Sequence, residues 1–152
     1  MTPRHFGLMA CLMAIVLLGM SLFGGTGVMS QQQAPTASNA WVRLPAASGR
    51  PGAGYLLLQG GAEADALVGA SSPATERIEI HSMTIEGGVM RMRAEPSIPV
   101  PAGQTVEFRP GGNHLMLFGL DPRLKPGERV PITLTFRSGA SATVQAQARP
   151  AG

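Results

Sequence analysis

The sequence of 152 residues contains a single cysteine, Cys11, which lies in an apolar N-terminal segment. If that segment is removed on export, the remaining chain has no thiol. A chain without thiols cannot form a disulfide framework, an Fe–S cluster or a thiolate nucleophile. It also cannot form a blue-copper electron-transfer centre, because that centre needs a cysteine thiolate.

Aromatic and charged residues are also scarce, at 5% and 14% of the chain. The formal net charge is +3, and basic and acidic residues are interspersed without a run of five like charges. Nucleic-acid binding needs clustered Lys and Arg with stacking aromatics, so we do not expect it. The sequence shows no Ser/His/Asp set, no paired carboxylates and no phosphate loop, and we therefore do not expect an enzyme.

Residues 1–30 have the pattern of a secretory signal peptide. Arg4 and His5 form a basic start, an apolar run follows over 6–23, and small residues come next. We expect cleavage between Gly27 and Ala40, a polar linker over 31–38, and export to the periplasm. The alternative is a retained leader that anchors the protein, because the apolar run is about as long as a minimal membrane span.

Cys11 follows Leu8-Met9-Ala10, which loosely resembles the cleavage box of lipoproteins. However, the apolar run continues well beyond Cys11, and only five residues separate this cysteine from the basic start. These two features favour a cysteine that is removed with the leader.

The rest of the chain is rich in turn residues. The sequence has 20 Gly and 13 Pro, scattered between short apolar stretches, and 44% of all residues are hydrophobic. This pattern predicts one all-β domain over 39–148, an antiparallel β-sandwich, followed by a short tail over 149–152. Pro99 and Pro101 cannot donate to a sheet ladder, so we expect an edge or a connection there. The expected strands cover 39–44, 53–59, 66–68, 77–83, 89–93, 105–109, 114–120, 132–137 and 142–148.

All histidines and methionines beyond the leader fall within 36 positions. Residues i and i+2 of a strand share a face, so the pairs among them could aim imidazoles and thioethers at one point. Thioethers favour Cu(I), imidazole suits copper, and zinc would normally recruit Cys, His or carboxylates. We expect Met90 to pack beneath this site and Met83 to support or replace a ligand. The six residues are His81, Met83, Met90, Met92, His114 and Met116.

The spacing of four of these residues resembles the copper-binding signature of the PCuAC family of periplasmic copper chaperones. His81 is followed after ten residues by Met92, and then after twenty-one residues by His114-Leu115-Met116. The flanking sequence is similar as well, and the resemblance covers roughly residues 39–148.

The resemblance implies a cupredoxin-like (immunoglobulin-like Greek-key) sandwich that binds one Cu(I) per chain through His81, Met92, His114 and Met116. It also implies delivery to the dinuclear copper site of cytochrome c oxidase, with Sco-type proteins as partners. Some relatives carry a His- and Met-rich C-terminal tail that binds additional copper. Residues 149–152 show no such tail, so we do not expect a second copper site, including one for Cu(II).

Two other functions fit the same sequence. A copper storage or resistance protein would sequester the ion without passing it on. A plain adhesion or scaffold sandwich would bind no metal.

Overall fold

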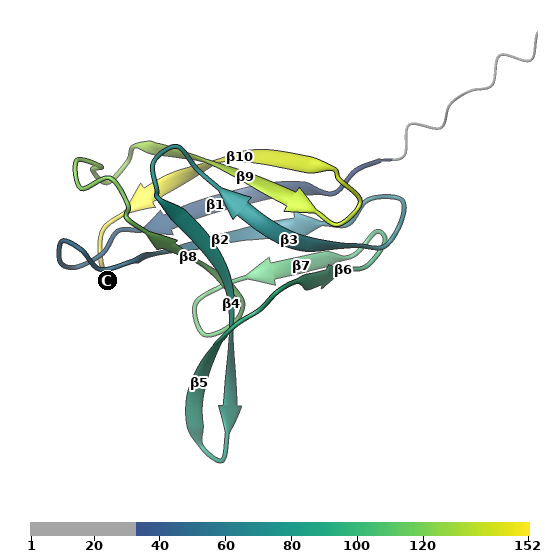
Figure 1. Cartoon of the computed structure of the whole chain (residues 1–152), viewed down its shortest axis with the longest axis horizontal. Helices are drawn as coiled ribbons and strands as arrows, with labels where there is room; N and C mark the ends of the chain where they lie inside the picture. The colour runs from purple at the N-terminus through teal and green to yellow at the C-terminus, as the bar shows by residue number, and fades with distance from the viewer. Residues whose placement is uncertain (1–32) are drawn as a thin grey trace, which may run out of the picture. The chain divides into compact units, whose positions relative to one another are not determined.

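The computed structural model describes residues 33–152, which form an all-β fold without a helix (Figure 1). No helix in this range could therefore cross a membrane. The predicted signal peptide and the first part of the predicted linker lie outside the described residues. The strands are β1 (Thr36–Arg43), β2 (Gly52–Gln59), β3 (Asp65–Ser71), β4 (Arg77–Glu86), β5 (Val89–Ala94), β6 (Ile98–Val100), β7 (Thr105–Phe108), β8 (His114–Phe118), β9 (Arg129–Phe136) and β10 (Ser141–Arg149).

Hydrogen bonds join the ten strands in the order β5-β4-β8-β2-β1-β10-β9-β3-β6, and β7 also pairs with β2. β2 accommodates two partners on one side because β8 pairs with Gly52–Gly54 and β7 with the following half of the strand. The all-β prediction is confirmed. The expectation of a purely antiparallel sheet is wrong at one place, since β1 and β10 run parallel. These strands lie at opposite ends of the domain's sequence, so no short turn constrains their relative direction.

The strands curl around one hydrophobic core. Along β9, for example, Val130, Ile132, Leu134 and Phe136 are each at most 1% exposed, while the residues between them face outward. This period of two is what a half-buried strand requires. It produces a single cluster to which almost every strand contributes, so the described residues share one core.

The start of β1 differs from the predicted strand limit, whereas the position of Pro99 agrees with the prediction. β1 begins at Thr36, three residues inside the predicted linker, and a bulge between Ser38 and Trp41 lets the strand continue along β2. Asn39 adopts a φ of 51° at this bulge, a conformation that asparagine tolerates better than most residues. Pro99 lies in β6, which ends the strand order, so the predicted edge is confirmed.

The β4–β5 hairpin extends beyond the rest of the sheet and protrudes from the sandwich (Figure 1). Its turn is Gly87-Gly88, and both glycines have positive φ, at 59° and 79°. Two consecutive positive φ angles define the two-residue turn that best matches the twist of a hairpin. β8 begins at His114, which pairs with His81, so the part of β4 after His81 has only β5 as a neighbour. Every residue of β5 is consequently exposed.

Candidate metal centre

The candidate site lies on the outer face of β4 and β8, opposite the core. Ile80 of β4 and Leu115 of β8 point inward and are at most 5% exposed. Their neighbours His81 and His114 therefore point to the other face, where the two histidines form one register pair. Their ring centroids are 5.7 Å apart, with 46° between the ring planes. The strand alternation predicted from the sequence thus places both imidazoles at one point of the sheet.

His114 is the one polar or charged residue among residues 33–152 that is buried, at 5% exposure. Its Nδ1 lies 3.0 Å from the carbonyl oxygen of Gly112. A carbonyl oxygen only accepts, so in the neutral imidazole Nδ1 carries the proton and Nε2 keeps a lone pair. That Nε2 lies 3.2 Å from Sδ of Met92, which is also an electron-pair donor. Two neutral donors held at this distance are suited to share a soft cation.

His81 is oriented by Glu79, two residues earlier on the same strand face. Oε2 of Glu79 lies 2.9 Å from Nε2 of His81, and Oε1 accepts from Nε of Arg77 at 2.9 Å. The hydrogen bond from His81, and then that from Arg77, lower the pKa of Glu79 below its ordinary value. The carboxylate is therefore ionised at neutral pH and accepts a hydrogen bond from the Nε2–H group of His81.

Nδ1 of His81 is left with the lone pair. This atom is buried and has no hydrogen-bond partner within the described part of the chain. A buried polar atom without a partner is costly unless a ligand satisfies it. A histidine that donates one ring N–H to a carboxylate and offers the other nitrogen outward is the usual arrangement of a metal-binding imidazole. Sequence reasoning missed Glu79, although its i, i+2 spacing from His81 could have indicated this pairing.

The two predicted methionine ligands come from strands on either side of β4. Met92 of β5 pairs with Met83 of β4, and its side chain reaches His114 as described above. Met116 of β8 is half-buried and pairs with Glu79, one step along the same face from the histidine pair. The structure thus brings His81, His114 and Met92 together, and it places Met116 beside them on the same face.

The predicted role of Met90 is wrong. Its side chain is 60% exposed, so it does not pack beneath the site. The reason is that Met90 pairs with Ile85, in the part of the hairpin that extends beyond β8. There β4 and β5 pair only with each other. Met83 is half-buried and lies directly opposite Met92, next to the site.

The donor set determines which ions the site suits. Residues 33–152 contain no group of three or more His, Cys, Asp or Glu side chains that could hold a metal ion. The donors present are two imidazole nitrogens and thioether sulfurs, all neutral. Soft, neutral donors of this kind suit Cu(I) better than the hard cations, which prefer oxygen ligands.

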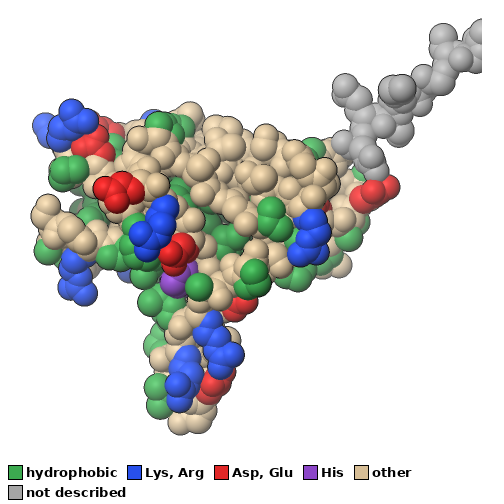
Figure 2. Space-filling model, viewed as in Figure 1, with side chains coloured by type: hydrophobic (Ala, Val, Ile, Leu, Met, Phe, Trp, Pro, Cys, Tyr) green, Lys and Arg blue, Asp and Glu red, His purple; other side chains and the backbone are tan. Residues whose placement is uncertain are grey.

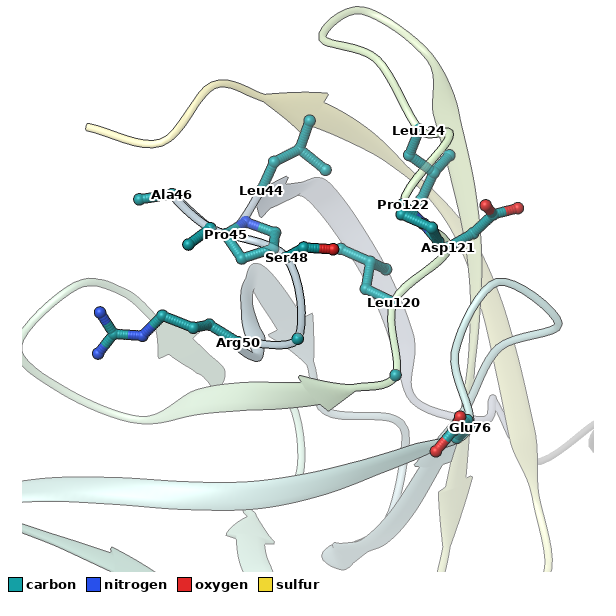
Figure 3. Close-up of a pocket in the computed structure, with 13 residues that line it drawn as sticks. Leu44, Pro45, Ala46, Ser48, Arg50, Glu76, Leu120, Asp121, Pro122 and Leu124 are labelled. Carbon is teal, nitrogen blue, oxygen red and sulfur yellow. The ribbon is translucent and has the colours of Figure 1, made fainter.

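A pocket of about 440 Å³ lies elsewhere, between the loop over residues 44–50 and the segment over 119–124 (Figure 3). Its walls include Leu44, Leu120 and Leu124, and the acidic residues Glu76 and Asp121 also line it. None of the six predicted site residues lines this pocket. It is therefore separate from the candidate metal centre.

Comparisons with known proteins identify the family of the chain. Residues 36–148 match the family described as "Putative lipoprotein LpqE-like". A curated relative, "Putative lipoprotein Lxx21020" of Leifsonia xyli subsp. xyli, is 32% identical over 154 residues, covering 95% of this chain and 90% of the relative.

Two solved structures illustrate the fold. The Cu(I) form of DR1885 from Deinococcus radiodurans is 31% identical, covers 78% of each chain and superposes with a TM-score of 0.60. The copper-bound PCuAC domain from PmoF2 is 21% identical, with a TM-score of 0.64, and covers 78% of this chain and 95% of that domain. The second likeness concerns the fold alone. The sequence motif predicted the fold of PCuAC domains, and the chain has that fold. The chain belongs to the LpqE-like family.

Proposed function

We propose that this protein is an exported copper carrier that binds one cuprous ion through His81, Met92, His114 and Met116. The observation that carries the proposal is the contact of 3.2 Å between Nε2 of His114 and Sδ of Met92. As a third donor we propose Nδ1 of His81, which is buried and has no hydrogen-bond partner among residues 33–152. The Cu(I)-bound relative DR1885, at 31% identity, supports copper as the ion.

Carriage rather than storage is supported by the exposure of the site. Met92 is 47% exposed, so an incoming ligand can reach the metal from the solvent side. Neutral thioethers hold Cu(I) less firmly than thiolates do, and an acceptor with cysteines could take the ion by stepwise exchange of ligands. The resemblance to PCuAC chaperones makes the copper-bearing subunit of cytochrome c oxidase our proposed acceptor, in cooperation with a Sco-type protein.

The proposed location follows from the leader and the family. The signal-like residues 1–30 support export with cleavage between Gly27 and Ala40. A membrane-attached form is the alternative that the lipoprotein description of the family favours. Attachment would use the retained leader or a lipid on Cys11, and the mature N-terminus distinguishes these forms from a cleaved one.

The test is an anaerobic titration of the exported protein with Cu(I) in competition with a Cu(I)-selective chelator. We expect one tightly bound ion, and we expect it to be lost in the double variant His114→Ala/Met116→Ala. X-ray absorption of the loaded protein should show nitrogen and sulfur neighbours together. Binding that is unchanged in the double variant would refute the site.

A second measurement separates carriage from storage. The loaded protein is mixed with a metal-free acceptor domain that presents two thiolates, and copper is assayed in both after separation. Transfer to the acceptor supports a carrier, whereas complete retention supports a storage protein.

A further inference from the structure

Exposed hydrophobic side chains of the described residues concentrate on the β4–β5 hairpin. Five large hydrophobic residues of this part are exposed, and four of them belong to the hairpin. They are Ile85, Val89, Met90 and Met92, at 73%, 56%, 60% and 47% exposure. Solvent-exposed methionines are uncommon in a stable sheet, because burying a thioether side chain is favourable. Their presence here therefore requires a reason.

The register of the hairpin places all three of its methionines on one face. Met83 pairs with Met92, and the next pair on that face is Ile85 with Met90. The pair that closes a two-residue turn is hydrogen-bonded, and pairs then alternate along the ladder. The Met83–Met92 and Ile85–Met90 pairs are accordingly of the non-hydrogen-bonded kind, in which opposite side chains lie closest.

Met83 is the central member of this group. It lies directly opposite Met92 and diagonally from Met90, and diagonal neighbours of this kind are within reach of long side chains. Methionine is unbranched and flexible, so three thioether sulfurs can converge here without a backbone movement. Thioethers are selective for soft ions such as Cu(I).

The opposite face of the hairpin has a different character. Arg93 donates to Oε1 of Glu86 at 2.7 Å, and Nε of Arg91 lies 3.4 Å from Oε2 of the same carboxylate. These ion pairs hold the guanidinium groups on the face opposite the methionines. Figure 2 shows the basic side chains along the protruding hairpin, with hydrophobic side chains at its other edge. The thioether face is therefore free of positive charge from this strand.

We propose that Met83, Met90 and Met92 form an outer site for a soft monovalent cation, and that Cu(I) passes through it on the way into and out of the inner site. The passage rests on the proposed function, whereas binding at the outer site does not. Met92 belongs to both sites, because its Sδ already lies 3.2 Å from Nε2 of His114. The ion moves inward when Met83 and Met90 are replaced as ligands by the two imidazoles. Copper stays cuprous throughout, and no proton or electron is transferred.

The test compares the wild type with three variants, each purified in its exported form without metal. The double variant Met83→Leu/Met90→Leu removes two sulfurs while conserving side-chain volume. Ile85→Leu changes a residue of the same face without affecting sulfur and is the matched control. Ile85→Met adds a fourth thioether to that face.

Binding at the outer site is followed with Ag(I), a soft ion that does not change oxidation state, by NMR of the methionine methyl groups. We expect a second, weaker equivalent of Ag(I) that shifts the Met83 and Met90 signals. It should be absent in the double variant, unchanged in Ile85→Leu and tighter in Ile85→Met. A wild-type protein that shows no shift of Met83 and Met90 at any Ag(I) concentration would refute the outer site.

Passage is tested by measuring the rates at which a chelator delivers Cu(I) to the protein and removes it again. A site on the path lowers the barrier in both directions, so the double variant should load and release roughly ten-fold more slowly with nearly unchanged affinity. Unchanged rates would refute passage. Failure of the proposed function gives a different result. Tight Cu(I) binding is then retained in His114→Ala/Met116→Ala, while the weaker Ag(I) equivalent persists.

Discussion

His81 and His114 face each other across one register pair of β4 and β8, and the structure holds their rings in opposite tautomers. His81 uses Nε2 for Glu79 and leaves Nδ1 free, whereas His114 uses Nδ1 for the carbonyl of Gly112 and leaves Nε2 free. In each ring one nitrogen is engaged by the protein and the other is available to an ion. The proposed ligands therefore keep one nitrogen of each ring unprotonated without a bound metal.

Glu79 should matter for copper affinity although it is not a ligand. Replacing Glu79 with Ala removes the acceptor for Nε2 of His81 and should weaken Cu(I) binding by about ten-fold or more. Glu79→Gln should cost less, because its amide oxygen can still accept a hydrogen bond from Nε2 of His81. Chelator competition measures both, with the exposed Glu63→Gln as the control. Wild-type affinity in Glu79→Ala would mean that the carboxylate does not orient the ring.

Neighbouring residues of β8 should separate stability from copper binding. Leu117 is fully buried, and Leu117→Ala should lower the free energy of unfolding by about 2–5 kcal/mol. Met116→Leu, on the other face, should cost less than about 1.5 kcal/mol but weaken copper binding. Chemical denaturation of the metal-free protein measures the loss of stability, and Cu(I) titration measures the loss of copper binding. A large loss of stability in Met116→Leu would place its side chain in the core.

Acid should weaken the fold partly through Asp121. Hydrogen bonds from the side chain and backbone of Arg123 lower the pKa of Asp121 from 3.8 to about 2. The contribution of this carboxylate to stability is complete above pH 3.8 and is lost as the pH falls toward 2. Thermal melts of the wild type and Asp121→Asn should therefore converge over this interval. Parallel pH curves for the two proteins would contradict the assignment.

The mature N-terminus tests the predicted leader. Mass spectrometry of the exported protein should find a first residue in the interval between Gly27 and Ala40. A chain that begins at a lipid-modified Cys11, or one that keeps Met1, would show this prediction to be wrong and would identify the membrane attachment directly.

Local patterns in the sequence were sufficient to predict that these histidine and methionine side chains share one face of the sheet. The alternation of Ile80 with His81, and the i, i+2 spacing of His114 and Met116, depend only on the period of a strand. What could not be predicted depends on pairing between distant segments. The parallel pairing of β1 and β10 is one example. The exposure of Met90 is another, because it depends on where β8 ends along β4.

The division of β4 and β8 into two faces has an evolutionary consequence. Ile80 and Leu115 build the core on one side, and His81 and His114 lie on the other, where we propose that copper binds. Substitutions among the outward positions can therefore retune the preferred ion, for instance by exchanging a thioether for an imidazole, while the packing that stabilises the domain is left intact. A scaffold arranged in this way can diversify its cargo within one lineage without first having to be restabilised.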